Sequence, residues 1–151
     1  ARFYRSLMQA RPAIVRLDLG FANNLDNEDL RIICEGLRLE HLDLSFNDSS
    51  LAADHPSAIE VIVESPCAQT LRSINLCQLP FIPEELLQLL RGCPKLAKLE
   101  WEAPEEDEYF SLFPIEDGPA VDAINALLKS RGGKAIAFFD EYGPRVRPPG
   151  H

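Results

Sequence analysis

The chain contains four copies of one short apolar pattern, and this repetition constrains the fold more than any other feature. Each copy has the form apolar-x-x-apolar-x-apolar, and the copies are Ile14–Leu19, Leu39–Leu44, Leu71–Leu76 and Leu96–Trp101. Their middle apolar residues follow one another after 25, 32 and 25 residues. The apolar-x-apolar end of each copy alternates with a period of two, which predicts a short strand with one buried face.

Segments with helical spacing of apolar residues follow the predicted strands, at residues 26–37, 57–64, 82–92 and 120–132. Asp26 or Asn27 is the expected N-cap of the first segment. In the third, Pro83 suits the first helical position, and Gly92 suits the position just after the helix. Residues 3–8 fit the last helix of a preceding unit, and residues 135–139 fit a fifth strand.

This order of strand, turn and helix, over roughly residues 12–139, resembles the leucine-rich repeat family and its ribonuclease-inhibitor-like branch. The segment Arg91–Leu99, with its Gly-Cys-Pro core, is similar to the cysteine-containing repeats of F-box substrate receptors. The resemblance implies an α/β leucine-rich repeat solenoid, with a short curved parallel sheet and helices on the convex side. It also implies that Asn47 bonds the turn backbone after its strand, a place that Leu79 takes in the third repeat.

We therefore expect a single leucine-rich repeat domain over residues 1–140, with about four repeats, end units and an acidic insertion at 102–119. Residues 141–151 are rich in Pro, which predicts an extended tail. The chain opens on Ala1, without Met or the apolar core of a signal peptide, so a processed chain or a fragment is expected. No apolar stretch approaches the roughly 18 residues of a membrane helix, so no membrane partner is expected.

The register of the strands decides which side chains leave the core. With the apolar residues inward, the open sheet face is expected to carry Arg16, Asp18, His41, Asp43, Ser45, Ser73, Asn75, Cys77, Lys98, Glu100 and Glu102. The central positions of this face are mostly acidic, which favours docking of a basic or polar surface. The alternative is a face that is only solvated, because Asp or Asn is ordinary at this position in the family.

The negative charge of the chain is concentrated in one segment. Residues 99–128 hold nine acids and no Lys, Arg or His, whereas the rest of the chain holds 15 acids and 15 bases. Within the acidic insertion, Tyr109, Phe110 and Phe113 follow the acidic run, which indicates a docking loop for a basic, partly apolar partner. The alternative is that these aromatic side chains pack as a cap over the last repeat. A net charge of −9 disfavours nucleic acid as a partner.

No catalytic, cofactor or metal site is expected. His41, Asp43 and Ser45 share one strand face, but alternate strand residues lie roughly 6.5–7 Å apart, beyond the reach of a serine–histidine relay. The chain lacks the spacing of metal ligands and of phosphate-binding loops. Helix-end cysteines at residues 34, 67 and 93 are expected to form a buried column, and Cys77 is the expected accessible thiol.

Together these features predict a non-enzymatic protein-interaction module or a scaffold subunit of a larger assembly. Four widely spaced cysteines read as reduced thiols, which favours an intracellular location. The expected partner-binding residues are Asp18, His41, Asp43, Asn75, Lys98, Glu100, Glu102, Tyr109, Phe110 and Phe113. The alternative function is that of a substrate-recognition fragment of an F-box-type ubiquitin-ligase receptor.

Overall fold

The computed structural model describes residues 5–6, 13–22, 25–101, 119–136, 138–140 and 143–145. In chain order its elements are β1 (Arg16–Asp18), α2 (Asn27–Gly36), β2 (His41–Asp43), α3 (Ser50–Ala53), α4 (Ala58–Val63), the 3-10 helix η1 (Pro66–Gln69), β3 (Ser73–Asn75), α5 (Pro83–Gly92), β4 (Lys98–Glu100), α7 (Pro119–Ser130), β5 (Phe138–Asp140) and β6 (Gly143–Arg145). Within these residues no helix has both the length and the apolar character needed to cross a membrane.

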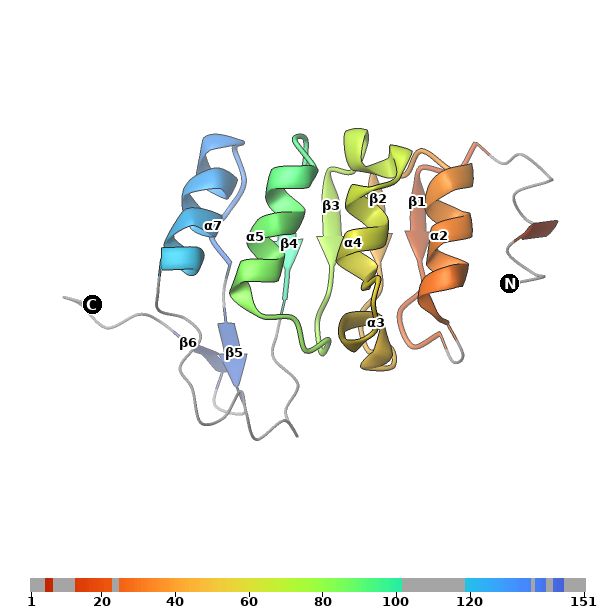
Figure 1. Ribbon diagram of the computed structural model, residues 1–151. Coiled ribbons are helices and arrows are strands. Elements are labelled where there is room, and N and C mark those ends of the chain that lie inside the picture. Colours follow the sequence, from red (N-terminus) through yellow and green to blue (C-terminus); the bar gives the residue numbers. More distant parts are fainter. Residues whose placement is uncertain are drawn as a thin grey trace.

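The first four strands form one parallel sheet in sequence order, β1-β2-β3-β4. The register aligns Leu17 with Leu42, Leu42 with Ile74 and Ile74 with Leu99, so equivalent residues of the sequence repeats lie side by side. The helices α2, α4, α5 and α7 follow one another along one face of this sheet, as Figure 1 shows. The predicted mixed α/β fold with a parallel sheet is therefore confirmed.

The apolar residues of the repeat pattern fill the space between the sheet and the helices. At the middle strand position Leu42, Ile74 and Leu99 are buried, and the residues two positions further on are buried as well. Leu17 is only partly buried, because β1 is the edge strand at the N-terminal end of the sheet. Burial of such side chains is the main favourable term in folding.

The helix starts follow from their capping residues. Asp26 is the N-cap of α2, since its Oδ1 accepts a hydrogen bond from Asp29 N at 2.8 Å and Asp29 Oδ2 accepts from Asp26 N at 3.3 Å. Ser57 caps α4 in the same way, because its Oγ accepts from Glu60 N at 3.3 Å. Each cap satisfies a backbone donor that the first helical turn leaves unpaired. Both helices begin where the sequence predicts.

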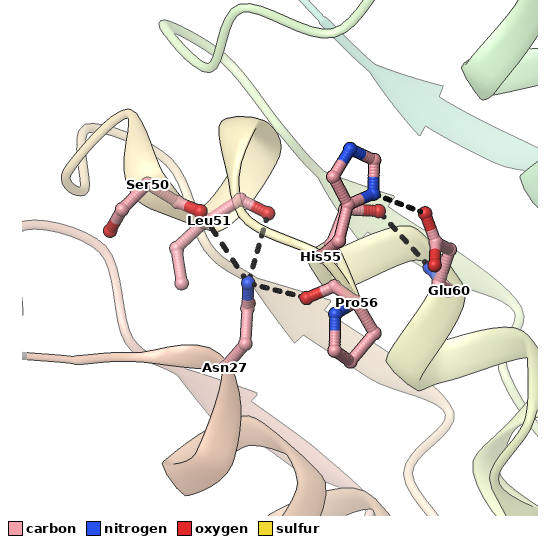
Figure 2. Close-up of polar contacts among 7 residues, drawn as sticks. Asn27, Ser50, Leu51, His55, Pro56 and Glu60 are labelled. Carbon is pink, nitrogen blue, oxygen red and sulfur yellow. Dashed lines mark hydrogen bonds and ion pairs between the residues drawn. The ribbon is translucent and has the colours of Figure 1, made fainter.

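Two short elements, α3 and η1, were not predicted, and both belong to the longer second repeat. Each spans four residues, too few for a helical period to appear in the sequence. Asn27, the first residue of α2, ties this region to its neighbour, as Figure 2 shows. Its Nδ2 donates to Pro56 O at 3.0 Å and lies 3.5 Å from Ser50 O and from Leu51 O.

Adjacent repeats are also joined by side-chain bonds at the turns that follow the strands. Asn47 Nδ2 lies 2.9 Å from both Leu19 O and Leu44 O, so it connects its own turn with that of the previous repeat. This confirms the expected role of Asn47. In the third repeat Leu79 takes that place, and its carbonyl accepts a hydrogen bond from Trp101 Nε1 at 2.9 Å. The next repeat thus bonds this turn through the backbone of Leu79, whereas Asn47 bonds its neighbours through a side-chain amide.

The expected fifth strand does not extend the main sheet. β5 pairs antiparallel with β6, and these two strands form a separate sheet. Beside β4 the chain passes through Gly133, where a Cβ atom would lie 1.8 Å from Ala97 O. This segment and β4 border a cavity of about 710 Å³ rather than continuing the ladder of β3 and β4. β6 lies within residues 141–151, for which an extended tail was predicted.

The prediction that Gly92 follows the end of α5 is wrong, since Gly92 is the last helical residue and Cys93 is the cap. The reason lies in the packing of α5 against α4. A Cβ atom on Gly92 would lie 2.5 Å from Val63 Cγ1 and 2.8 Å from Val63 Cβ. Both atoms belong to a β-branched side chain with little rotamer freedom, so glycine at this position permits the close approach of the two helices.

The substitution Gly92→Ala is expected to destabilise the protein by about 1–3 kcal/mol, because the added methyl group overpacks the contact with Val63. The sign is diagnostic, since alanine in place of glycine ordinarily stabilises a helix by about 1 kcal/mol. Urea unfolding measures the change. Gly36→Ala, at the exposed end of α2, is the control and should not destabilise. The double variant G92A/V63A should recover part of the free energy of unfolding that G92A loses. A G92A variant more stable than the native protein would contradict the packing argument.

Candidate functional site

The face of the sheet opposite the helices carries two parallel rows of polar side chains. The strand register aligns the first residue of each strand in one row, here called the basic row: Arg16, His41, Ser73 and Lys98. The third residue of each strand forms a second row, here called the acidic row: Asp18, Asp43, Asn75 and Glu100. Since the rows are two residues apart on each strand, about 6.5–7 Å separates them.

Both rows line a shallow groove of about 270 Å³ on this open face. Six of the ten predicted partner-binding residues lie along it: Asp18, His41, Asp43, Asn75, Lys98 and Glu100. The predicted Glu102, Tyr109, Phe110 and Phe113 lie outside the described residues. The groove is therefore built from side chains that strand alternation predicts to share one face.

The acidic row has a structural role in addition to its position on the surface. In the first three strands its side chain accepts a hydrogen bond from the backbone N–H two residues further on. Asp18 Oδ1 accepts from Gly20 N at 2.9 Å, and Asp43 Oδ1 accepts from Ser45 N at 2.9 Å. Asn75 Oδ1 accepts from Cys77 N at 3.0 Å. Aspartate and asparagine serve this purpose equally, which explains their interchange along the row.

The basic row contains one close polar contact. His41 Nδ1 lies 2.6 Å from Ser73 Oγ on the neighbouring strand. At the last strand Lys98 Nζ pairs with Glu100 Oε1 at 3.2 Å, which joins the two rows. Both side chains of this pair are well exposed, so the pair contributes little to stability and its charges stay accessible to a partner.

Ser45 is not exposed on the open face, and that part of the prediction is wrong. Its buried Oγ donates to Asp43 Oδ1 at 2.6 Å, and it lies close to Gly20 in the turn of the previous repeat. His41, Asp43 and Ser45 therefore form no catalytic relay, since Ser45 bonds the acid and His41 contacts Ser73. The backbone N–H of Ser73 donates to Glu40 O, so it does not stabilise a developing oxyanion.

Sequence reasoning missed an exposed aromatic pair at the turns after β1 and β2. The rings of Phe21 and Phe46 stack with centroids 4.5 Å apart and planes 7° apart. Each occupies the third position after an acidic-row residue and has positive φ, 58° and 57°. Gln78 occupies the same position in the third repeat, with φ of 66°. The recurrence of Phe two residues after the last strand leucine in two consecutive repeats was the available signal.

This backbone conformation is costly for the two phenylalanines. A residue other than glycine in the left-handed region costs about 1–3 kcal/mol. Phe21 is 69% exposed and Phe46 is 45% exposed, so burial of the rings offsets only part of that cost. Strained and exposed aromatic side chains are typical of binding surfaces, and this pair lies at the acidic-row end of the sheet.

Three cysteines form the expected buried column at equivalent places of successive repeats. Cys34, Cys67 and Cys93 are all buried, and Cys67 Sγ donates to Leu37 O at 3.1 Å. The hydrogen bond with Cys67 and burial hold the pKa of Cys34 well above its ordinary value. Burial raises the pKa of Cys93 to about 12. Cys77 is half-buried beside the acidic row, which agrees with its predicted accessibility.

Comparisons of the chain with protein-family models, with curated proteins and with solved structures found no match. The functional assignment therefore rests on the residues and geometry described above.

The substitution Asp43→Ala should destabilise the protein by about 1–3 kcal/mol, because it leaves the N–H and Oγ donors of buried Ser45 without their acceptor. Asp43→Asn should stay within about 0.5 kcal/mol of the native protein, since Asn75 makes the equivalent bond in the next strand. Urea unfolding separates the two variants. Equal losses in both would show that the charge, and not the turn bond, is what Asp43 contributes to stability.

Thiol labelling tests the buried column. At pH 8 the native chain should expose one reactive thiol to Ellman's reagent, that of Cys77, because the other three are buried. Cys77→Ser should abolish the native reaction, and unfolding in guanidinium should release the remaining thiols. Rapid reaction of any of the three remaining thiols in the folded Cys77→Ser variant would contradict their burial in the core.

Proposed function

We propose that the chain is a leucine-rich repeat solenoid whose open sheet face binds a protein partner without catalysing a reaction. The repeated sequence pattern, the in-register parallel strands and the row of helices on one face support this fold. Asp18, Asp43 and Asn75 each accept a hydrogen bond from the backbone N–H two residues further on, so the repeats share a turn structure as well as a sequence pattern. Such stacks expose a broad rigid surface that binds partners rather than small molecules.

The observation that carries the proposed function is the groove bordered by the basic and acidic rows. Its lining comes from all four strands of one sheet, so its shape is fixed by backbone hydrogen bonds. It is shallow and mostly polar, unlike the deep apolar pockets that hold small ligands. A protein surface with basic groups opposite the acidic row, and acidic or polar groups opposite the basic row, fits these two rows.

The predicted acidic loop at residues 102–119 belongs to the same proposal. In this proposal Glu102 adds an acidic contact, and Tyr109, Phe110 and Phe113 add aromatic contacts, to the acidic contact of the exposed Glu100. The alternative, a substrate-recognition fragment of an F-box-type receptor, would use the same face. Co-purification of a ubiquitin-ligase adaptor would favour that narrower function over a general scaffold.

Removal of three charges from the acidic row tests the proposal. The variant D18N/D43N/E100Q keeps the acceptors for Gly20 N and Ser45 N, so it should fold normally. A partner captured by the native chain in affinity purification should be reduced at least about tenfold, since contacts between opposite charges in an interface often contribute more than 1.4 kcal/mol in total.

A matched control removes the same charge elsewhere. Glu35, Glu64 and Glu84 are exposed on the helical side or at helix ends, and E35Q/E64Q/E84Q should leave capture unchanged. Equal capture by the native chain and the acidic-row variant would overturn the proposed face. Equal loss in both variants would show that only the net charge matters.

A further inference from the structure

The exposed aromatic pair of Phe21 and Phe46 lies at the turns after β1 and β2 and is not part of the groove lining. Among the described residues the exposed large apolar side chains are Val15, Phe21, Phe46 and Ile82, and Phe21 is the most exposed of them. The pair is preformed, because the two rings already stack and their turns are held by side-chain bonds. A partner that contacts these rings therefore loses little freedom in ordering them.

Two carboxylates lie at the base of the same turns. A Cβ atom on Gly20 would lie 3.2 Å from Asp18 Oδ1, 3.5 Å from Asp43 Oδ1 and 3.1 Å from Ser45 Oγ. Gly20 directly precedes Phe21, so both acids converge at the start of the turn that carries the aromatic ring. Their Oδ1 atoms hold the turn backbone. Within the described part of the chain, neither Oδ2 atom takes part in a hydrogen bond or an ion pair. These oxygens can therefore accept a hydrogen bond from a partner.

An exposed aromatic pair carried by the same turns as two carboxylates is suited to one kind of side chain. Arginine combines a planar cation, which stacks on an aromatic ring, with a fork of N–H donors that matches a carboxylate. Lysine offers a point charge without the planar fork, and an apolar side chain leaves the carboxylates without a donor. Charge complementarity and planarity together select arginine.

We propose that Phe21 and Phe46, with Asp18 and Asp43, form the docking position for an arginine side chain of the protein partner. The guanidinium stacks on the exposed aromatic pair and donates to the carboxylate oxygens that the turns leave open. This inference rests on the proposed function, and it adds that the basic residue facing the N-terminal end of the acidic row is an arginine.

The test uses blocked amino acids as probes of the full chain, monitored by the NMR signals of Phe21 and Phe46. N-acetyl-arginine amide should produce saturable shifts at both residues. The lysine analogue should bind about two- to fivefold more weakly, the range expected for loss of one exposed stacking contact. The citrulline analogue, a neutral isostere, and the leucine analogue should produce no saturable shift.

Variants locate the effect. F21Q/F46Q places at both positions the residue that the third repeat carries as Gln78, so the turns should still form. This variant should bind the arginine probe at least about two- to fivefold more weakly. Ile82→Gln, an exposed apolar residue outside these turns, should bind as the native chain does. Thermal unfolding verifies that both variants are folded.

Several outcomes would overturn the inference. Equal shifts with arginine and citrulline, or with arginine and leucine, would show an uncharged or apolar docking point. Unchanged arginine affinity in F21Q/F46Q would place the probe elsewhere. Dimerisation in sedimentation that F21Q/F46Q abolishes would assign the rings to a second copy of the chain.

The two proposals fail in different ways. A captured partner that D18N/D43N/E100Q loses and F21Q/F46Q keeps would retain the proposed face and reject the arginine position. A partner that neither variant affects would reject the proposed face itself.

Discussion

The backbone ladder of the four parallel strands is the interaction on which the rest of the structure depends. It joins residues 25 to 32 positions apart at a constant register, Leu17 to Leu42, Leu42 to Ile74 and Ile74 to Leu99. A slip of one residue between two strands would move every leucine of one repeat to the solvent side. The helices pack as a single row because the ladder holds their strands side by side. The two polar rows exist for the same reason.

Much of the fold follows from the sequence because its signals are local and repeated. The strand positions, the Asp26 and Ser57 caps and the turn bond of Asn47 each depend on residue types within a few positions. What sequence reasoning misplaced depends on distant contacts. Gly92 lies inside α5 because of Val63 on another helix, and the short α3 is tied to Asn27 of the previous repeat. Neither neighbour is visible in a local pattern.

The candidate site divides in the same way. Strand alternation alone predicts that Asp18, His41, Asp43, Asn75, Lys98 and Glu100 share a face, and all six line the groove. Ser45 is buried instead of exposed because its Oγ bonds Asp43 and lies against Gly20 of the previous repeat, a contact that alternation does not reveal. The aromatic pair was missed for a related reason, since residues in turns have no period from which to read their direction. Both residues have a left-handed backbone and their rings stack, which no periodic pattern of the sequence indicates.

The opposite character of the two rows has one more consequence. Arg16 and Lys98 stand at the ends of one row, and Asp18 and Glu100 stand at the ends of the other. Positive charge therefore lies at the start of these strands and negative charge at their end. The proposed partner, rotated by half a turn in the plane of the sheet, would meet like charges at the end formed by Arg16 and Asp18, whereas Lys98 and Glu100 pair with each other at the other end. For the proposed protein partner, the strand register would therefore favour one docking orientation over its reverse.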